Sequence, residues 1–477
     1  MARKKPRTPN PFIPMRFLHK PLLLGLILAT PLPCSAESET SFRTVDGYKG
    51  IWFDLGQRSE FGSKYSGGLG TYTAKHCPMA IYSKEANKTF FVYGGTTAAD
   101  QRHLLAMLSY YDHATGKVPK PVIVHDKQGV DDPHDNPSIQ IDGEGHLWVF
   151  VSGRGRTRPG IIYRSEKPWD IHSMKHVEDG EFTYPQPWWV PDQGFAIFFT
   201  KYTKGRELYV IQSNKTGEMQ GKGIKLAGMG GHYQVSSAHG RHLITAFNMH
   251  PGGDVDKRTN LYFVQSHSGG KLWLDIHGNK LFPPLTDPKG SALVRDYQSE
   301  GRLVYMKDIA TDWLGQPVIL YLTAASHEPG PKGDPRIWTI ARWNGEKWEF
   351  HEITRSTHNY DMGSLYLGFD TWKVIAPTEA GPQKHGAGGE IAVWISTDEG
   401  KTWKKEKQLT TGSQRNHGYV RRPHNAHPDF YSFWADGNPD ALSESRLYFT
   451  NRDGSNVRLL PYEMNEAEAT PTLLPSN

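Results

Sequence analysis

The chain has 477 residues, of which 55 are Lys or Arg and 50 are Asp or Glu. Six of the basic residues and none of the acidic ones lie in residues 1–36, so the rest of the chain, with 49 basic and 50 acidic residues, is nearly neutral. Its net charge therefore does not indicate nucleic acid as a partner or insertion into a membrane. Cys77 is the one cysteine after residue 36, which excludes an intrachain disulfide and a cysteine-rich zinc site in that part of the chain.

Residues 1–36 have the pattern of a secretory signal peptide. Basic residues precede the apolar run PLLLGLILATPL, and small residues lead up to Ala36. The apolar run is too short to span a bilayer comfortably, and Pro33 before Cys34 disfavours a lipoprotein anchor. We therefore expect cleavage after Ala36 and a secreted or periplasmic protein, with residues 37–477 forming a single domain.

Short strand-like runs recur along the whole chain, whereas long amphipathic helix patterns are scarce. The runs are rich in aromatic and β-branched residues and are bounded by Gly, Asp, Asn and Pro, as in KTFFVYGG, HLWVFVSG and EIAVWIST. A repeating unit of roughly 45–60 residues built from short strands is typical of a β-propeller. The sequence predicts an all-β, seven-bladed β-propeller, although the length fits six to eight blades.

One repeat motif is well defined. Residues 396–403 read STDEGKTW, which resembles the Asp-box turn of sialidase-type propellers. In such a turn Ser and Asp side chains bond the backbone of a tight hairpin, and Gly takes a conformation that other residues avoid. Weaker copies begin at Ser213, Ser266 and Asn344. The motif predicts the fold and carries no chemistry of its own.

The stretch 110–137 combines two histidines with acidic, amide and aromatic side chains. His113 follows YYD, and His134 lies in DDPHDNP directly before a strand-like run. Loops at the rim of a sheet often carry function, and His has the ordinary pKa closest to neutrality, which suits proton transfer. The alternative is that His134 and Asp135 only cap a turn.

Other polar and aromatic residues precede predicted inner strands, so we expect them at the mouth of the central channel. The candidate substrate-binding residues among them are Asn136, His232, Tyr233, His358 and Tyr360. The alternative for the histidines is that they are hydrogen-bonded caps packing the channel. Arg154, in SGRGRTRPG, is a candidate for binding sulfate or carboxylate, unless its loop is simply solvated. Trp188 is a candidate for stacking on a sugar, unless it belongs to the core.

These motifs together resemble the BNR-repeat proteins that include the ulvan lyases of polysaccharide lyase families 24 and 25 and the related rhamnose–glucuronate lyases. The resemblance rests on YYDH, DDPHDNP, TYPQPWW, FFTKYTKGREL and HNYDMGSLY, and it extends from about residue 48 to 449. It implies a seven-bladed propeller that cleaves a rhamnose–uronate polymer by β-elimination. It also implies a catalytic set of two histidines, a tyrosine and an arginine, matched here by His113, His134, Tyr184 and Arg206.

β-Elimination explains why these residue types would be needed. The C5 proton of a uronate is weakly acidic because the carboxylate opposes the carbanion, so a fixed cation must offset that charge, and Arg206 is the candidate. A base must take the C5 proton and an acid must protonate the departing O4. We expect Tyr184 and His113 to transfer these protons, and His134 to share the carboxylate or orient His113. No cofactor is required, and a metal ion, calcium or zinc, would be structural.

Two other functions remain open at this point. A sialidase-like glycoside hydrolase would use the same fold, but the sequence lacks a convincing early arginine motif. A non-catalytic carbohydrate-binding propeller is the other alternative, because a fold alone does not establish catalysis. In each case the expected partner is a carbohydrate, for the lyase an acidic polysaccharide with or without sulfate, and we expect a monomer.

Overall fold

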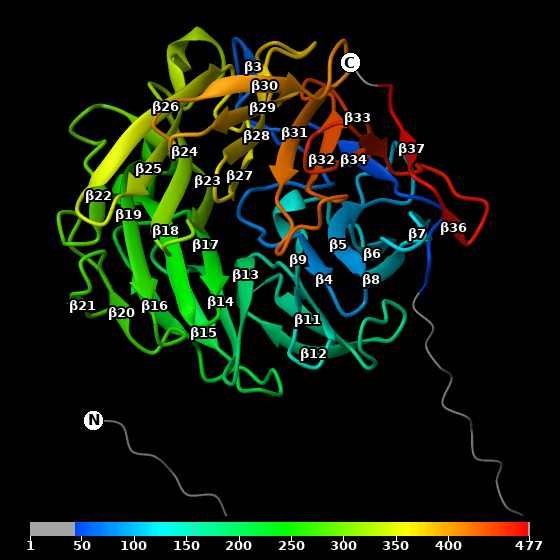
Figure 1. The fold of residues 1–477 in the computed structure, drawn as a ribbon, viewed down its shortest axis with the longest axis horizontal. Helices are drawn as coiled ribbons and strands as arrows, with labels where there is room; N and C mark the ends of the chain where they lie inside the picture. The colour runs from blue at the N-terminus through cyan, green and yellow to red at the C-terminus, as the bar shows by residue number, and fades with distance from the viewer. Residues whose placement is uncertain (1–42, 156, 476–477) are drawn as a thin grey trace, which may run out of the picture. The chain divides into compact units, whose positions relative to one another are not determined.

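The computed structural model describes residues 43–155 and 157–475, which all belong to one compact unit. The predicted signal peptide lies outside these residues. The described chain is all-β, and its sheets are arranged around a common centre as a seven-bladed β-propeller (Figure 1). The fold prediction is therefore confirmed. Helical structure in the described part is limited to short 3-10 turns, and none of it could span a membrane.

Each blade is an antiparallel sheet whose first strand lies nearest the centre (Figure 1). The first blade contains β4 (Ala80–Ser83), β5 (Lys88–Gly95), β6 (Leu105–Asp112) and β8 (Val122–Asp126). The second contains β9 (Pro137–Ile141), β10 (Leu147–Val151), β11 (Gly160–Ser165) and β12 (Met174–Gly180). The third contains β13 (Thr183–Val190), β14 (Gly194–Tyr202), β15 (Arg206–Gln212) and β16 (Ile224–Ala227).

The remaining four blades follow the same order. The fourth contains β17 (Gln234–His239), β18 (His242–Met249), β19 (Thr259–Ser266), β20 (Trp273–Leu274), β21 (Lys280–Leu281) and β22 (Leu293–Arg295). The fifth contains β23 (Leu303–Thr311), β24 (Pro317–Ala324), β25 (Arg336–Trp343) and β26 (Trp348–Ser356). The sixth contains β27 (Ser364–Leu367), β28 (Trp372–Glu379), β29 (Glu390–Ser396) and β30 (Lys404–Gln408). The seventh contains β31 (Asn416–Arg421), β32 (Ser432–Gly437), β34 (Leu447–Thr450), β35 (Val457–Leu459) and β37 (Thr472–Leu473).

Short elements tie the two ends of the described chain to the ring. β1 (Gly50–Trp52) pairs with β33 (Ser443–Ser445), and β7 (Val118–Pro119) pairs with β36 (Glu468–Ala469). The other short elements are β2 (Arg58–Ser59), β3 (Gly62–Ser63), η1 (Pro133–Asp135), η2 (Pro251–Gly253), η3 (Val255–Lys257) and η4 (Pro331–Gly333). The pairing of β7 with β36 joins the first blade to the C-terminal segment and so helps to close the ring.

Middle strands of the blades are mainly apolar because both faces of each sheet pack against neighbouring blades. In β10 all five residues, LWVFV, are buried, and in β24 all eight are. Trp52, Trp148, Trp338 and Trp434 are fully buried. This packing explains why the strands read as continuous hydrophobic runs and not as an alternating pattern.

The Asp-box copies occupy equivalent hairpins in four blades, each joining the third strand to the fourth. In the well-defined copy, Asp398 accepts from the Thr402 N–H at 2.9 Å, Ser396 accepts from the Gly400 N–H at 2.8 Å, and Gly400 has a φ of +86°. Ser266 and Ser268 make the matching bonds in the fourth blade, to Gly270 and Leu272. The motif therefore recurs as a structural turn, as predicted.

Antiparallel strands give the propeller two distinct faces. We call the face at which the first strand of each blade begins the strand-start face, and the other the strand-end face. The third strand of a blade begins on the strand-start face, whereas the second strand ends there. Side chains at the start of a first or third strand, or at the end of a second strand, therefore meet on the strand-start face.

Candidate active site

A cluster of tyrosines, histidines and cations lies on the strand-start face. Its members share a position before a first strand, at the start of a first or third strand, or at the end of a second strand. They are Tyr65, Tyr72, Lys75, His76, Asp132, His134, Arg154, Tyr184, Tyr202, Arg206, Tyr233, Arg258, Tyr305 and Tyr360. Six of the predicted site residues are thereby brought together: His134, Tyr184, Arg206, Arg154, Tyr233 and Tyr360.

His134 is held at both ring nitrogens. It lies in η1, where Asp132 caps the turn by accepting from the His134 backbone N–H at 3.1 Å. The same carboxylate lies 2.5 Å from Nδ1, and the Tyr72 hydroxyl lies 3.1 Å from Nε2. A proton on Nδ1 therefore leaves Nε2 as the acceptor. Burial lowers the pKa of His134, with Asp132 opposing the shift, so the ring is neutral at neutral pH.

Tyr184 lies at the start of β13 in an unusual backbone conformation. Its φ is +54°, and the pairing of β13 with β14 shifts register between Thr183 and Gln186. A bulge of this kind re-aims a side chain, and here the ring lies 5.8 Å from that of His134. Burial raises the pKa of Tyr184 well above its ordinary value, although Arg154 opposes the shift. The phenol therefore keeps its proton at neutral pH and can donate it.

Arg154 and Arg206 lie on the ring of Tyr202. The guanidinium carbon of each is 5.7 Å from the Tyr202 ring centroid. Arg154 also pairs with Asp132 at 3.8 Å, whereas Arg206, among the described residues, contacts the Tyr202 ring and has no ion pair. The planar guanidinium of Arg206 is therefore free to bind a carboxylate or sulfate in a two-pronged contact.

Two further cations are buried without an acidic partner among the described residues. Lys75 is 5% exposed, and its Nζ lies 4.3 Å from the ring centroid of Tyr233. Arg258 is 2% exposed and lies against Tyr305, Tyr233 and Tyr360 at 4.5, 5.0 and 5.6 Å. Burial, together with Arg258, lowers the pKa of Lys75 well below its ordinary value. Burying unpaired charge is costly, so this cluster is suited to an anionic ligand.

The structure separates His113 from the rest of the predicted set, which corrects the expectation of a shared site. His113 follows the end of β6 on the strand-end face, and β8 then carries the chain back before His134. Its Nε2 lies 2.8 Å from Thr89 Oγ1, and its ring lies 3.7 Å from that of His427. Burial and the His427 ring lower the pKa of His113 to about 4.

Three more predicted contact residues are caps and not exposed site groups. His232 accepts from the Met229 N–H and contacts the Asn248 carbonyl, which engages both ring nitrogens. His358 accepts from the Tyr360 N–H. Asn136 is fully buried and donates to the Gly70 and Tyr72 carbonyls, so it positions the segment that carries Tyr72.

Trp188 is also a packing residue. Its side chain is buried, its Nε1 donates to Ser236 Oγ at 2.8 Å, and its ring contacts His424. It lies near the end of β13, towards the strand-end face, so the expectation that it stacks on a sugar in the cluster is wrong.

Several members of the cluster were not predicted from the sequence. Tyr72, Lys75 and His76, in YTAKH, precede β4 in the way that DDPHDNP precedes β9. Their position before a first strand was the available signal. Arg258 follows the polar turns of η2 and η3 and resembles a solvent-exposed loop residue in sequence, yet it directly precedes the third strand β19 on the same face.

The comparisons with known proteins agree with this architecture. The model of the BNR repeat-containing family matches residues 88–356, and the chain belongs to this family. A solved ulvan lyase of polysaccharide lyase family 25 has 16% sequence identity and a TM-score of 0.65, over 86% of this chain and 96% of that one. The same lyase bound to -[GlcA(1-4)Rha3S]- gives a TM-score of 0.64 at the same identity and coverage. A comparison with curated proteins finds no match.

Proposed function

We propose that this chain is a polysaccharide lyase that cleaves a polymer of rhamnose and uronic acid, such as ulvan, by β-elimination. The observation that carries the proposal is the cluster itself, in which a neutral histidine and a protonated tyrosine lie among cations that lack acidic partners. The similarity in fold to an ulvan lyase, solved with a uronate–sulfated rhamnose ligand, supports the same substrate class.

In the proposed reaction His134 is the base. Its Nε2 takes the C5 proton of the uronate, while Asp132 keeps Nδ1 protonated and stabilises the imidazolium that forms. In the free protein the Tyr72 hydroxyl lies at Nε2, so substrate binding at that atom replaces this contact. The C4–O4 bond then breaks and a C4=C5 double bond forms.

Tyr184 is the proposed acid. The departing O4 takes the phenolic proton of Tyr184, and the nearby cations stabilise the phenolate left behind. Arg206 binds the uronate carboxylate. Its charge thereby offsets the negative charge of the carboxylate, which opposes removal of the C5 proton, in the transition state. Arg154, which lies against the ring of Tyr202 as Arg206 does, is the proposed contact for a sulfate or the next carboxylate. In this scheme side chains carry every step, so catalysis requires no cofactor.

Hydrolysis is the alternative reaction on this fold, and the charges in the cluster argue against it. Glycoside hydrolases use two carboxyl groups, one of which must hold a proton at working pH. Burial raises the pKa of Asp132, but His134 and the arginines outweigh this and hold it well below its usual range. The carboxylate that contacts His134 in the described cluster is therefore a poor acid.

The test is to incubate the purified protein with ulvan, gum arabic, heparan, chondroitin and pectin, and to follow the ultraviolet absorbance of the unsaturated uronate. We expect absorbance to rise with a rhamnose–uronate polymer. His134→Ala should abolish the rise, whereas His176→Ala, which removes an exposed histidine paired with Asp179, should not. Sugar binding with no such absorbance from any polymer would favour the non-catalytic alternative.

A further inference from the structure

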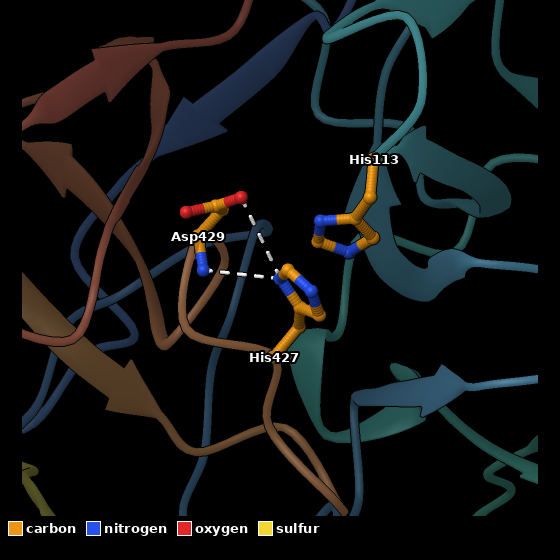
Figure 2. A group of neighbouring side chains, drawn as sticks. All are labelled: His113, His427 and Asp429. Carbon is orange, nitrogen blue, oxygen red and sulfur yellow. Dashed lines mark hydrogen bonds and ion pairs between the residues drawn. The ribbon is translucent and has the colours of Figure 1, made fainter.

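A second histidine cluster consists of His113, His427 and Asp429 (Figure 2). It lies on the strand-end face, away from the proposed active site. His113 comes from the turn after β6 in the first blade, and His427 and Asp429 come from the connection between β31 and β32 in the seventh. Each of the three offers a ligand atom, and these atoms lie within 4.8 Å of one another. None of the three has a part in the proposed elimination.

The hydrogen bonds of His113 leave one nitrogen unused. Its Nε2 lies 2.8 Å from Thr89 Oγ1, and its Nδ1 is buried without a hydrogen-bond partner among the described residues. If Nε2 donates its proton to Thr89, then Nδ1 keeps a free lone pair. Metal-binding histidines typically have this arrangement, because the second nitrogen donates to a neighbour that fixes the tautomer. A buried polar atom without a partner also calls for an explanation.

We propose that His113, His427 and Asp429 bind a zinc ion that joins the first blade to the seventh. Two imidazoles and one carboxylate form a ligand set suited to Zn²⁺, with water in the fourth position. Calcium prefers oxygen ligands throughout, so the two imidazoles favour zinc over calcium in this proposal.

The distances within the cluster require a modest rearrangement on binding. His427 Nδ1 lies 3.8 Å from Asp429 Oδ2 and 3.1 Å from the Asp429 backbone nitrogen. Ligand atoms on a tetrahedral zinc lie about 3.3 Å apart, so binding draws the three side chains slightly together. The metal also replaces the hydrogen bond from the Asp429 N–H. Asp429 is mostly exposed, and this allows it to move.

The position of the cluster gives the metal a structural role. Near it the first and seventh blades are joined by a short bridge, in which the Tyr82 N–H donates to the His424 carbonyl at 3.0 Å. The Tyr82 ring also contacts both His113 and His427. A metal that binds the folded chain but not the unfolded one raises stability with its concentration. Here it would do so by joining the two blades that close the ring.

The test is to remove metal from the full protein with a chelator and then to titrate it with Zn²⁺ alone. The heat of binding and the Tm are measured. We expect one zinc per chain and a rise in Tm of several degrees. His427→Gln and Asp429→Asn should each weaken zinc binding by at least about tenfold and reduce the Tm shift. The matched control is His103→Gln, which breaks a pair with Asp126 in the first blade, the blade that carries His113. This variant should keep the zinc affinity and the Tm shift of the parent.

The metal-free Tm of each variant separates folding from binding. The proposal expects the metal-free variants to melt close to the metal-free parent and to differ from it only when zinc is added. Unchanged zinc affinity in both His427→Gln and Asp429→Asn would overturn the proposal. So would zinc binding with no change in Tm, or a preference for Ca²⁺ over Zn²⁺.

Discussion

The two faces of this propeller each carry a histidine beside a carboxylate and tyrosines, yet their surroundings differ. On the strand-start face His134 is oriented by Asp132 and lies near Arg154 and Lys75. On the strand-end face His113 lies against His427 and keeps an unused nitrogen. Similar residue types are thus set up for proton transfer in one place and for metal binding in the other. The difference lies in the surrounding charge and in the second partner of each ring.

The largest effect is expected when each histidine is removed in turn, which tests whether His134 and His113 have different roles. His134→Ala should lower kcat/KM by a factor of about 10²–10⁴, the usual contribution of a general base. His113→Gln should leave kcat/KM nearly unchanged and lower Tm instead, since His113 contacts Thr89 and His427 but no member of the active-site cluster. Steady-state kinetics and melting curves on both variants make the measurement. Equal losses of activity would contradict the separation of the two faces.

The next effect concerns Arg206. Arg206→Ala and Arg206→Lys should both lower kcat/KM by on the order of a hundredfold, because lysine keeps the charge but loses the planar fork. The control is Arg241→Ala, which removes an exposed arginine paired with Asp192. Near-full activity in both Arg206 variants, with Tm unchanged, would move the carboxylate contact to Arg154 or Lys75.

The pH profile tests the link between Asp132 and His134. A base works in its unprotonated form, and burial holds the pKa of His134 below its ordinary value of 6.5. The acid limb of kcat/KM should therefore lie below pH 6.5. Asp132→Asn removes the charge that raises this pKa, so the limb should move to still lower pH, with a loss of rate of at least about tenfold as imidazolium stabilisation disappears. Asp179→Asn, beside the exposed His176, should do neither; an unmoved limb in Asp132→Asn would argue against His134 as the base.

The smallest effect is expected at Lys75, and its sign is informative. Lys75→Met keeps a long side chain and removes a buried charge without an acidic partner, so the free protein should become more stable by about 1 kcal/mol or more. KM for the polyanion should rise at the same time. Lys201→Met, which breaks a pair with Glu181, is the control. Lower stability together with unchanged KM would mean that Lys75 is structural.

The sequence contained enough to predict the fold, and the physical reason lies in its turns. The Asp-box at Ser396–Trp403 and its weaker copies recur at the same hairpin of different blades, so one local pattern repeats throughout the architecture. The structure also brings together His134, before a first strand, and Tyr184, at the start of one, because the start of a first strand always reaches the same face.

The prediction for His113 was wrong because the spacing to His134 was treated as proximity. The stretch between them contains PVIVHD, which forms β8 and crosses the blade from one face to the other. A single strand between two residues places them on opposite faces. Only an even number of strands between His113 and His134 would have placed both on the same face. Arg258 and Lys75 could not be assigned from composition, since only the packing of separate blades brings both of them to the ring of Tyr233.

The measurement that tests elimination most directly is digestion of a rhamnose–uronate polymer in water labelled with heavy oxygen, followed by mass spectrometry of the products. Elimination forms a C4=C5 double bond and adds no water, so the products of the cleaved bond should carry no label and the uronate end should be lighter by one water. Hydrolysis would incorporate the label at the new reducing end. Label in the products, lost in His134→Ala, would show that the same cluster hydrolyses its substrate and would contradict the account.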